Sequence, residues 1–264
     1  MTAILGYTGR VFLTGTHAFL AACSLIVDIL FWITIAPLRG KGLRVRAAVE
    51  QFVRVGYNSL PIVMLITFLL GAILAMQSAY QLSRFGVIYL VPNLVGVAAV
   101  RELAPLMTAI LITGRSGSAF TAEIGTMKVS EEIDALEVMG LNPTKYLVVP
   151  KFIGTTLAVP MVTMVATLTM ILGGFAISTA YLGQDPRAYL ESSADAITIK
   201  DFANGFTKSV FFAIVICVVG VYRGFEVEGG AEGVGKKTTS SVVTSIFLIV
   251  VVDVLFTYLF FSES

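Results

Sequence analysis

Four ionisable residues stand inside long apolar runs, where charge is costly: Arg101, Glu102, Lys208 and Asp253. A charged side chain within a bilayer needs a partner or water, and it marks a functional site by default. The adjacent residues Arg101 and Glu102 project about 100° apart on a helix, so they do not pair with each other. We therefore expect each of them to find its partner on another element of the chain.

Counted inward from the outer boundary of the apolar runs, these groups share one level. At 1.5 Å per residue, Arg101 lies about 12–15 Å deep, Lys208 about 10 Å and Asp253 about 13 Å. Two interpretations stay open here. The groups form structural ion pairs between helices, or some of them line a wet cavity in which Arg101 and Lys208 bind an anionic headgroup. Tyr80 and Gln81 could edge that cavity, although interfacial anchoring explains a tyrosine at this place equally well.

The elements that must hold these groups are six long apolar blocks. Of the 264 residues, 56% are hydrophobic and 13% are charged, against about 45–50% and about 25% in soluble domains. A helix needs about 20 apolar residues to cross about 30 Å of hydrocarbon, and an open strand could not satisfy its backbone there. The composition therefore predicts an all-α integral membrane protein, with blocks at 11–38, 55–79, 91–112, 152–182, 202–221 and 242–261.

Basic residues in the links between these blocks give the orientation. Alternate links differ in their Lys and Arg content by about four to one, and the richer set faces the cytoplasm. The cytoplasmic set is Arg39, Lys41, Arg44, Arg46, Arg54, Arg115, Lys128, Lys145, Lys151, Arg223, Lys236 and Lys237, and the opposite set is Arg84, Arg187 and Lys200.

The first block, 11–38, is ambiguous because it carries His17 and Asp28 in an otherwise apolar run and Pro37 near its end. It either crosses the membrane or lies in the inner interface as a monotopic or re-entrant helix. We favour the interfacial or re-entrant interpretation, since a span would bury the charge of Asp28. The later blocks keep their orientation in both cases, because the basic residues at 39–54 fix it.

A short amphipathic helix is predicted over 130–140, in the widest cytoplasmic link. Ser130 is a suitable N-cap, and acidic residues fill the first turn, where the helix dipole favours anions. Gly140 supplies a left-handed stop, and Pro143 forbids continuation. The sequence therefore places a discrete helix outside the membrane between the second and third spans.

The apolar stripe of this helix needs a partner, because a helix of this length is not stable alone. That partner is either the chain's own loops or a cytoplasmic subunit. We favour the subunit, since a small acidic helix between two spans has little of its own chain to pack against. The residues expected at the contact are Glu131, Glu132, Ile133, Asp134, Leu136, Glu137, Met139 and Gly140.

The sequence carries no convincing catalytic or metal constellation. His17, Cys23 and Cys217 give neither zinc spacing nor a disulfide framework. The stretch 230–237 almost matches the phosphate-binding G-x-x-x-x-G-K-[ST] loop, but Lys237 stands where the magnesium-binding hydroxyl is needed. A net charge of +1 argues against a nucleic-acid partner. We therefore expect no cofactor, no nucleic acid and no covalent chemistry by the chain itself.

Two stretches closely resemble the MlaE/YrbE permease family. The stretch 101–143 reads RELAPLMTAILITGRSGSAFTAEIGTMKVSEEIDALEVMGLNP, and the stretch 230–243 reads GAEGVGKKTTSSVV. Chain length and block pattern agree along nearly the whole chain. The first motif is long and specific, so chance similarity does not explain it.

The resemblance implies a permease subunit of a bacterial inner-membrane ABC transporter that moves phospholipid between inner and outer membranes and maintains outer-membrane lipid asymmetry. It implies a homodimer, a separate cytoplasmic ATP-hydrolysing subunit, a periplasmic hexamer of MCE domains, and a STAS-domain protein attached to the ATPase. The implied fold is an N-terminal interfacial helix plus five transmembrane helices, with a cytoplasmic coupling helix that maps onto 131–140. The family's lipid cavity, at the dimer axis, maps onto Arg101, Glu102 and Lys208.

A second function class stays open beside this one. A stand-alone secondary transporter or channel could use Arg101, Glu102 and Asp253 as an ion or proton relay. It predicts transport by the chain alone, driven by a gradient. The lack of a useful internal repeat weakens it, and a membrane-embedded lipid enzyme lacks a nucleophile paired with a base.

Overall fold

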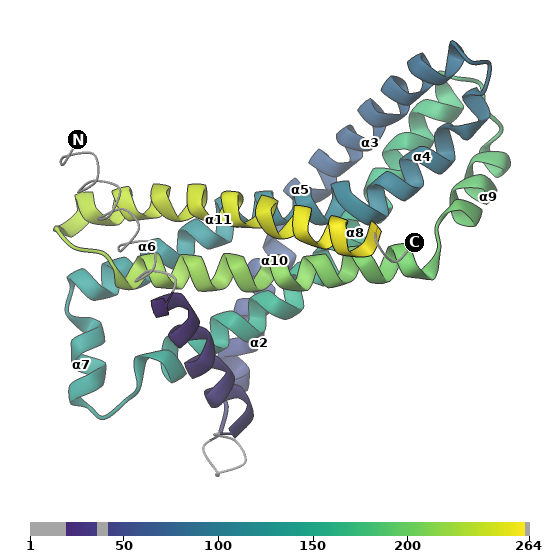
Figure 1. The fold of residues 1–264 in the computed structure, drawn as a ribbon. Helices are drawn as coiled ribbons and strands as arrows, with labels where there is room; N and C mark the ends of the chain where they lie inside the picture. The colour runs from purple at the N-terminus through teal and green to yellow at the C-terminus, as the bar shows by residue number, and fades with distance from the viewer. Residues whose placement is uncertain (1–19, 36–41, 262–264) are drawn as a thin grey trace, which may run out of the picture.

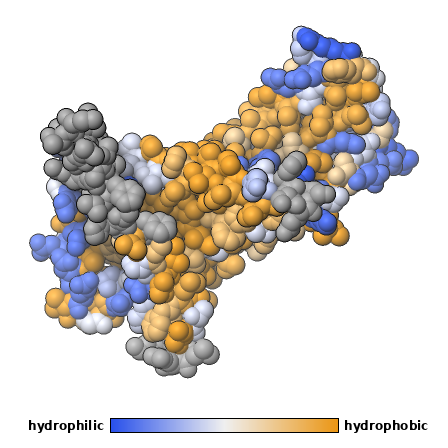
Figure 2. All heavy atoms as spheres, viewed as in Figure 1, coloured by the Kyte–Doolittle hydropathy of each residue, from blue (hydrophilic) through white to orange (hydrophobic). Residues whose placement is uncertain are grey.

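The computed structural model describes residues 20–35 and 42–261, and the regular elements within these ranges are helices. Together they form an elongated bundle (Figure 1). Hydrophobic residues cover the middle of the visible face, and hydrophilic residues gather towards its two ends (Figure 2). The predicted all-α, multi-pass membrane fold is confirmed, because five of the described helices are long and apolar enough to cross a membrane: Val45–Ser83, Ile88–Val129, Thr144–Ala180, Ile199–Phe225 and Gly230–Phe260.

Three of these spans are built from several helical pieces. The first comprises α2 (Val45–Val55), η1 (Tyr57–Ser59) and α3 (Leu60–Ser83). The second comprises η2 (Ile88–Leu90), α4 (Val91–Ala98), η3 (Ala99–Leu103), α5 (Ala104–Ile112), η4 (Thr113–Gly117) and α6 (Ser118–Val129). The third joins η5 (Thr144–Val148) to α8 (Val149–Ala180). The elements η3, η4 and η5 are π-helical turns, which often occur at functional sites.

The other two spans are α10 (Ile199–Phe225) and α11 (Gly230–Phe261). Two short helices, α7 (Glu132–Val138) and α9 (Pro186–Ala196), lie at opposite ends of the bundle (Figure 1). The end that carries α7 also carries the α10–α11 turn, and the end that carries α9 also carries the α3–α4 turn. This alternation agrees with the orientation predicted from the basic residues.

The helices are longer than the apolar blocks from which they were predicted. The block 55–79 lies within a helical stretch that begins at Val45, and the block 91–112 lies within one that continues to Val129. Hydropathy marks only the part of a helix that lies in hydrocarbon, whereas helical hydrogen bonding continues into the polar ends. The extensions matter, because they place Arg54, Arg115 and Glu123 on rigid helices instead of loops.

The described part of the first block is a helix over Leu20–Ile35. Asp28 is exposed, and Ile29 packs into a cluster with Ile124 of α6 and Val218 of α10. His17 and Pro37 lie outside the described residues, and the interfacial course of the first block stays a prediction.

The α3–α8 contact brings two backbones together through glycine. A Cβ atom at Gly71 would overlap the carbonyl oxygen of Met170, and one at Gly173 would overlap the carbonyl oxygen of Phe68. Small residues at such crossings let membrane helices approach closely. A side-chain hydrogen bond between Thr67 Oγ1 and Thr169 Oγ1, 2.6 Å long, crosses the same seam.

The change Gly173→Ala is expected to lower the free energy of unfolding by about 3 kcal/mol or more, because the added methyl meets backbone that cannot rotate away. The measurement is thermal unfolding of the purified chain in detergent. The matched control is Gly235→Ala in α11. Within the described part of the chain, nothing outside its own helix lies within 4 Å of the added Cβ, so we expect this change to be neutral or stabilising by about 1 kcal/mol. Equal melting temperatures for both variants would contradict the close approach of α3 and α8.

Helix α9 was not predicted from the sequence. It begins at Asp185, whose side chain accepts a hydrogen bond from the Ala188 backbone N–H. Its anchor is Tyr189, which is buried against Phe175 with ring centroids 5.5 Å apart. Burial raises the pKa of Tyr189 to about 12, so its hydroxyl stays protonated and directed at the Ile171 carbonyl oxygen, 3.4 Å away. The helix thereby covers the outer ends of α4 and α8.

Candidate functional site

A buried ammonium group joins three transmembrane helices in the outer half of the bundle. Lys208 of α10 is wholly buried, and its Nζ lies 2.6 Å from Glu102 Oε2 of η3 and 3.0 Å from Asp253 Oδ1 of α11. It also lies 2.8 Å from Thr257 Oγ1, and that hydroxyl is 3.0 Å from Glu102 Oε1. We call these four residues the Lys208 cluster. The structure therefore brings together three of the four intramembrane charges that the sequence placed at one level.

The ammonium group of Lys208 is held by hydrogen bonds and by charge. It donates to Glu102 Oε2 and to Thr257 Oγ1, while Asp253 Oδ1 forms an ion pair with it and has no hydrogen-bond partner among the described residues. Lys208 is wholly buried between the two carboxylates. For Lys208 the geometry thus favours the ion-pair interpretation over a role as headgroup donor.

Arg101 lies apart from this cluster, on another side of the same π-helical turn. Its Nε lies 3.3 Å from Asp201 Oδ1 at the start of α10. The other carboxylate oxygen of Asp201 closes a capping box with Thr198, so the acidic group is fixed by the helix that it begins. As expected, Arg101 and Glu102 do not pair with each other. Each of them has its own partner.

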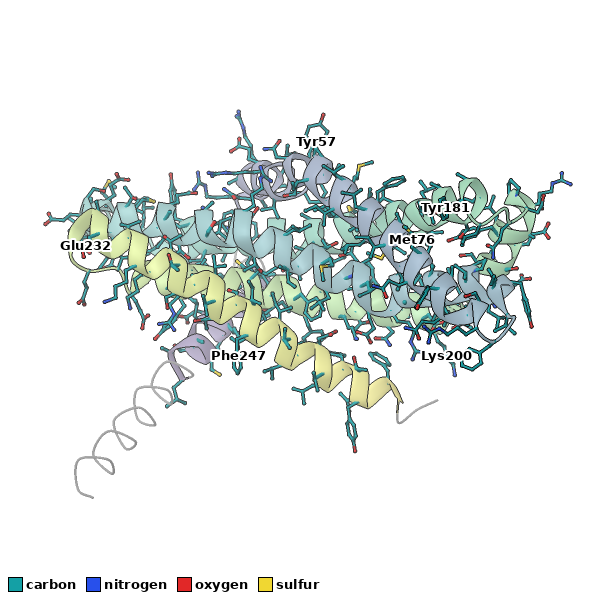
Figure 3. All side chains as sticks on the ribbon, turned by 90° about the horizontal axis from the view of Figure 1, so that it is seen from above. Tyr57, Met76, Tyr181, Lys200, Glu232 and Phe247 are labelled. Atoms are coloured by element: carbon teal, nitrogen blue, oxygen red, sulfur yellow. The ribbon has the colours of Figure 1, made fainter. Side chains whose placement is uncertain are left out.

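The Arg101–Asp201 pair lines a pocket of about 480 Å³. Lys200 adds a second cation, and Figure 3 shows this residue at the outer end of α10. Asn204 also lines the pocket; it is 4% exposed, and its Oδ1 has no hydrogen-bond partner among the described residues. Two cations and one carboxylate thus line the pocket, which suits a negatively charged ligand group, whereas the unpartnered Asn204 oxygen is an acceptor and requires a hydrogen-bond donor.

An apolar groove of about 510 Å³ lies on a third side of the turn, between α3 and the α4–α5 segment. Leu103 contributes directly to it, one residue after Glu102. The turn η3 therefore sends three consecutive side chains to three places: the Asp201 pocket, the Lys208 cluster and the groove. Residues that line the groove include Leu74, Gln77, Gln81, Leu82, Leu103 and Met107.

Tyr80 lies outside both pockets. It is exposed, its hydroxyl accepts a hydrogen bond of 2.6 Å from Arg84 Nη2, and the Arg84 guanidinium lies 4.8 Å from its ring centre. Its neighbour Gln81 lines the groove as expected for a cavity edge. For Tyr80 itself the structure favours interfacial anchoring.

Among the residues of these sites that were missed in the sequence are Asp201, Asn204 and Thr257. The pattern Thr198-x-x-Asp201 is a recognisable capping box, but nothing in it indicates that the spare oxygen would hold an arginine. Thr257 follows Asp253 by four residues, so the two share a helix face. A search for polar residues at i+4 from each intramembrane charge would have found it.

The cytoplasmic helix α7 runs over Glu132–Val138 and is shorter than the predicted 130–140. The expected N-cap role of Ser130 is wrong: its backbone N–H and its hydroxyl both donate to the Thr126 carbonyl oxygen, so Ser130 ends α6. Glu131 takes the N-cap position with a left-handed φ of 60°. Gly140 has the expected left-handed conformation, with φ of 74°.

The expectation that α7 has little of its own chain to pack against is wrong. Ile133 and Leu136 are both buried. Ile133 belongs to a cluster that includes Ile124 of α6 and Phe152 of α8. The most exposed large apolar residues here are Val138, 89% exposed, and Met139, 65% exposed. The remaining predicted contact residues, Glu131, Glu132, Asp134, Glu137 and Gly140, are also exposed.

A charged cluster fixes the α10–α11 turn at the same end of the bundle. Glu226 Oε2 lies 2.8 Å from Arg223 Nη1 and 3.1 Å from Lys237 Nζ. Burial alone raises the pKa of Glu226, but hydrogen bonds from Tyr222, Lys237 and Arg223 outweigh it, so the pKa is lowered below its ordinary value. The carboxylate therefore stays ionised near neutral pH and holds the turn next to α6.

Known proteins place this arrangement in a family. The sequence matches the family described as Permease MlaE over residues 48–259. A probable ABC transporter permease protein of Rickettsia typhi is 34% identical over 251 residues, which cover 95% of this chain and 97% of that protein. A probable ABC transporter permease protein of Synechocystis is 35% identical over 82% of each chain. The chloroplastic protein TRIGALACTOSYLDIACYLGLYCEROL 1 of Arabidopsis thaliana is 34% identical over 85% of this chain and 64% of its own length.

The matched region contains the three-way turn η3, the helix α7 and the α10–α11 turn, and the helical, multi-pass architecture agrees with a permease. Coverage on both sides is nearly complete for the Rickettsia protein. The chain belongs to the MlaE permease family.

Proposed function

We propose that this permease moves phospholipid between the inner and outer membranes of a bacterium and so maintains the lipid asymmetry of the outer membrane. The chain lies in the inner membrane as a homodimer and performs no covalent chemistry. A separate cytoplasmic subunit hydrolyses ATP for it. The family resemblance adds a periplasmic hexamer of MCE domains, to which lipid passes, and a STAS-domain protein bound to the ATPase.

The observation that carries this proposal is the pair of pockets around η3. The groove is apolar and offers room for acyl chain, at about 510 Å³, within the usual range for small-molecule sites. The neighbouring pocket holds Arg101 and Lys200, which suit a phosphate-bearing headgroup. An amphipathic cargo requires both environments within a few residues of each other, and a simple ion does not. The name of the Arabidopsis relative, which contains that of a glycerolipid, favours the same class of cargo.

The proposal requires that another chain hydrolyse ATP, and α7 is the helix through which the resulting movement reaches the permease. The relatives are named as permeases of ABC transporters. Ile133 ties α7 into a cluster with residues of α6, α8 and the N-terminal helix. A push on α7 by a closing ATPase would therefore move several helices as one body and reshape the pockets at the other end.

The proposal is tested by placing a photo-crosslinking residue at Met107, in the groove, in the purified complex in nanodiscs. The complex is washed with lipid-free detergent before irradiation, and we expect lipid at this position to survive the wash and become cross-linked. The matched control is Leu168 of α8, which is 63% exposed and should lose its annular lipid in the same wash. Labelling that is lost equally at both positions would contradict a lipid site in the groove.

The rival function, a stand-alone secondary transporter or channel, requires that the chain transport without a partner. If Arg101, Glu102 and Asp253 formed an ion or proton relay, the chain reconstituted alone would transport solute, driven by a gradient. Such transport without any ATPase would overturn the proposal.

A further inference from the structure

A second cation-rich pocket lies on the cytoplasmic side, away from both pockets above. It has a volume of about 200 Å³ and is bordered by the end of α2, by η4 and by the start of α6. Arg54 and Arg115 both line it, together with Val55, Ser116, Ala119 and Phe120.

The charges around this pocket do not balance. Glu123 is the carboxylate there: its Oε2 lies 3.0 Å from Arg54 Nη1, and its Oε1 lies 2.6 Å from Nζ of the buried Lys151. Arg115 has no carboxylate within salt-bridge distance among the described residues. Three cations thus share one anion, and two positive charges are left uncompensated.

The hydrogen bonds that these two arginines make within the protein use only some of their N–H donors. Arg115 Nη1 donates to Ser59 Oγ over 2.6 Å and to the Arg54 carbonyl oxygen over 3.4 Å, which closes the end of α2. Arg54 uses Nη1 for Glu123. A guanidinium has five N–H donors, and the others on these two exposed side chains have no hydrogen-bond partner among the described residues.

This pocket, which we call the lower pocket, lies on the cytoplasmic side of the groove and borders the same span, Ile88–Val129. Leu103 and Met107 line the groove, and Arg115 and Ala119 line the lower pocket. Arg115 belongs to the second π-helical turn of this span, about 21 Å along the helix from Arg101. Both π-helical turns of the span thus present an arginine to a pocket, one near each side of the membrane.

The level of the lower pocket matches the inner lipid–water interface. It adjoins the joint at which the amphipathic helix α2 gives way to the apolar helix α3. Tyr57 lies in this joint, is 71% exposed and points outward in Figure 3. Exposed tyrosines in membrane proteins gather at the headgroup level, where lipid phosphates lie.

We propose that Arg54 and Arg115 bind a phosphate group at the level of the cytoplasmic leaflet, and that this phosphate belongs to a phospholipid. The inference rests on the proposed function, because it gives the transported lipid a second station, on the inner side of the span that also forms the groove. Two guanidinium forks facing one small pocket suit the bidentate geometry of a phosphate. Free inorganic phosphate shares that chemistry, so the test separates the two sources.

The experiment uses the full-length permease in complex with its ATPase, in nanodiscs that contain phosphatidylglycerol. A photo-crosslinking residue replaces Ala119 in the lower pocket, with a parallel sample labelled at Met107. We expect lipid at both positions. Arg54→Gln and Arg115→Gln should each raise the lipid concentration needed for labelling at position 119 by about tenfold and leave labelling at Met107 unchanged.

The controls separate charge at the pocket from folding and from general attraction to lipid. Arg46 lies on the same helix as Arg54 and pairs, among the described residues, with Glu50 alone, so Arg46→Gln should change neither label. Arg115 also closes the end of α2, so a loss of labelling in Arg115→Gln must be separated from a loss of folding. Its labelling is therefore compared with that of Arg54→Gln only where the two variants have equal melting temperatures. Labelling at Met107 without labelling at position 119 overturns this inference and leaves the proposed function standing. No label at either position defeats the proposed function itself.

Inorganic phosphate at millimolar concentration is the second arm. Phosphate that protects Arg115 from arginine-specific modification, without lipid labelling at position 119, would assign the pocket to free phosphate and overturn the lipid assignment. Lipid labelling that resists millimolar phosphate supports it. Equal labelling in the wild type and in both glutamine variants would show that the arginines bind no phosphate at all.

Discussion

Replacing Lys208 by methionine is expected to lower the free energy of unfolding by about 3 kcal/mol, near the lower end of the range of about 3–5 kcal/mol for breaking a buried ion pair. The wild-type ammonium is wholly buried between Glu102 and Asp253. Without it, two carboxylates face each other and Thr257 loses a donor. Glu102 is 35% exposed, so water offsets part of the loss and keeps it at the lower end.

The loss is measured as a fall in melting temperature in detergent, at about 2–4 °C per kcal/mol for a chain of this size. The triple variant Lys208→Met, Glu102→Gln, Asp253→Asn should recover part of it, because neutral amides do not repel each other. Lys200→Met is the matched control, since this exposed lysine on the same helix should matter by less than about 0.5 kcal/mol. A Lys208→Met melting temperature equal to that of the control would show that the cluster does not hold the three helices together.

The sequence predicted which charges lie at one level, but not how they pair. Rise per residue converts position along a helix into depth, so Glu102, Lys208 and Asp253 could be placed together before the structure was known. Direction around the helix axis is harder, because η3 is a π-helical turn that alters the angle between successive side chains. Arg101 therefore turns to Asp201, a residue that sequence reasoning had assigned no role.

The membrane spans were predictable for a similar reason. Long apolar runs have few alternatives to a transmembrane helix, so each later block overlaps one span, although the block 152–182 extends two residues beyond Ala180. Helix α9 has no such run, and it is held instead by the single buried ring of Tyr189. That ring contacts Phe175, a residue distant in sequence, and local pattern does not reveal such contacts.

The misplaced start of α7 shows how two local signals compete. Ser130 precedes an acidic turn and so looks like an N-cap, but α6 continues to Val129 and its last turn takes the hydroxyl of Ser130 first. The burial of Ile133 depends on Val148 and Phe152, which the chain supplies only after the next turn. The part of the stripe that remains free is therefore displaced to Val138 and Met139, at the end of the helix.

The second large prediction concerns these two exposed residues. The double change Val138→Asp, Met139→Asp is expected to weaken association with the ATPase by at least about 30-fold, because truncating a central apolar anchor of an interface costs about 2 kcal/mol or more. The two side chains are 89% and 65% exposed, so the folded chain should tolerate the change. Association is measured by co-purification in mild detergent, and coupling is measured as ATP turnover stimulated by the permease.

Two further variants separate docking from folding. Leu136→Glu places a charge on a buried side chain, so it should lower the melting temperature as well as binding, and it is no test of the surface. Leu190→Asp changes an apolar residue of α9 that is 51% exposed at the opposite end of the bundle, and it should leave ATPase binding intact. If the Val138→Asp, Met139→Asp chain still bound the ATPase and stimulated ATP turnover, the ATPase would have to bind another surface. Helix α7 would then serve only to pack α6 and α8 together.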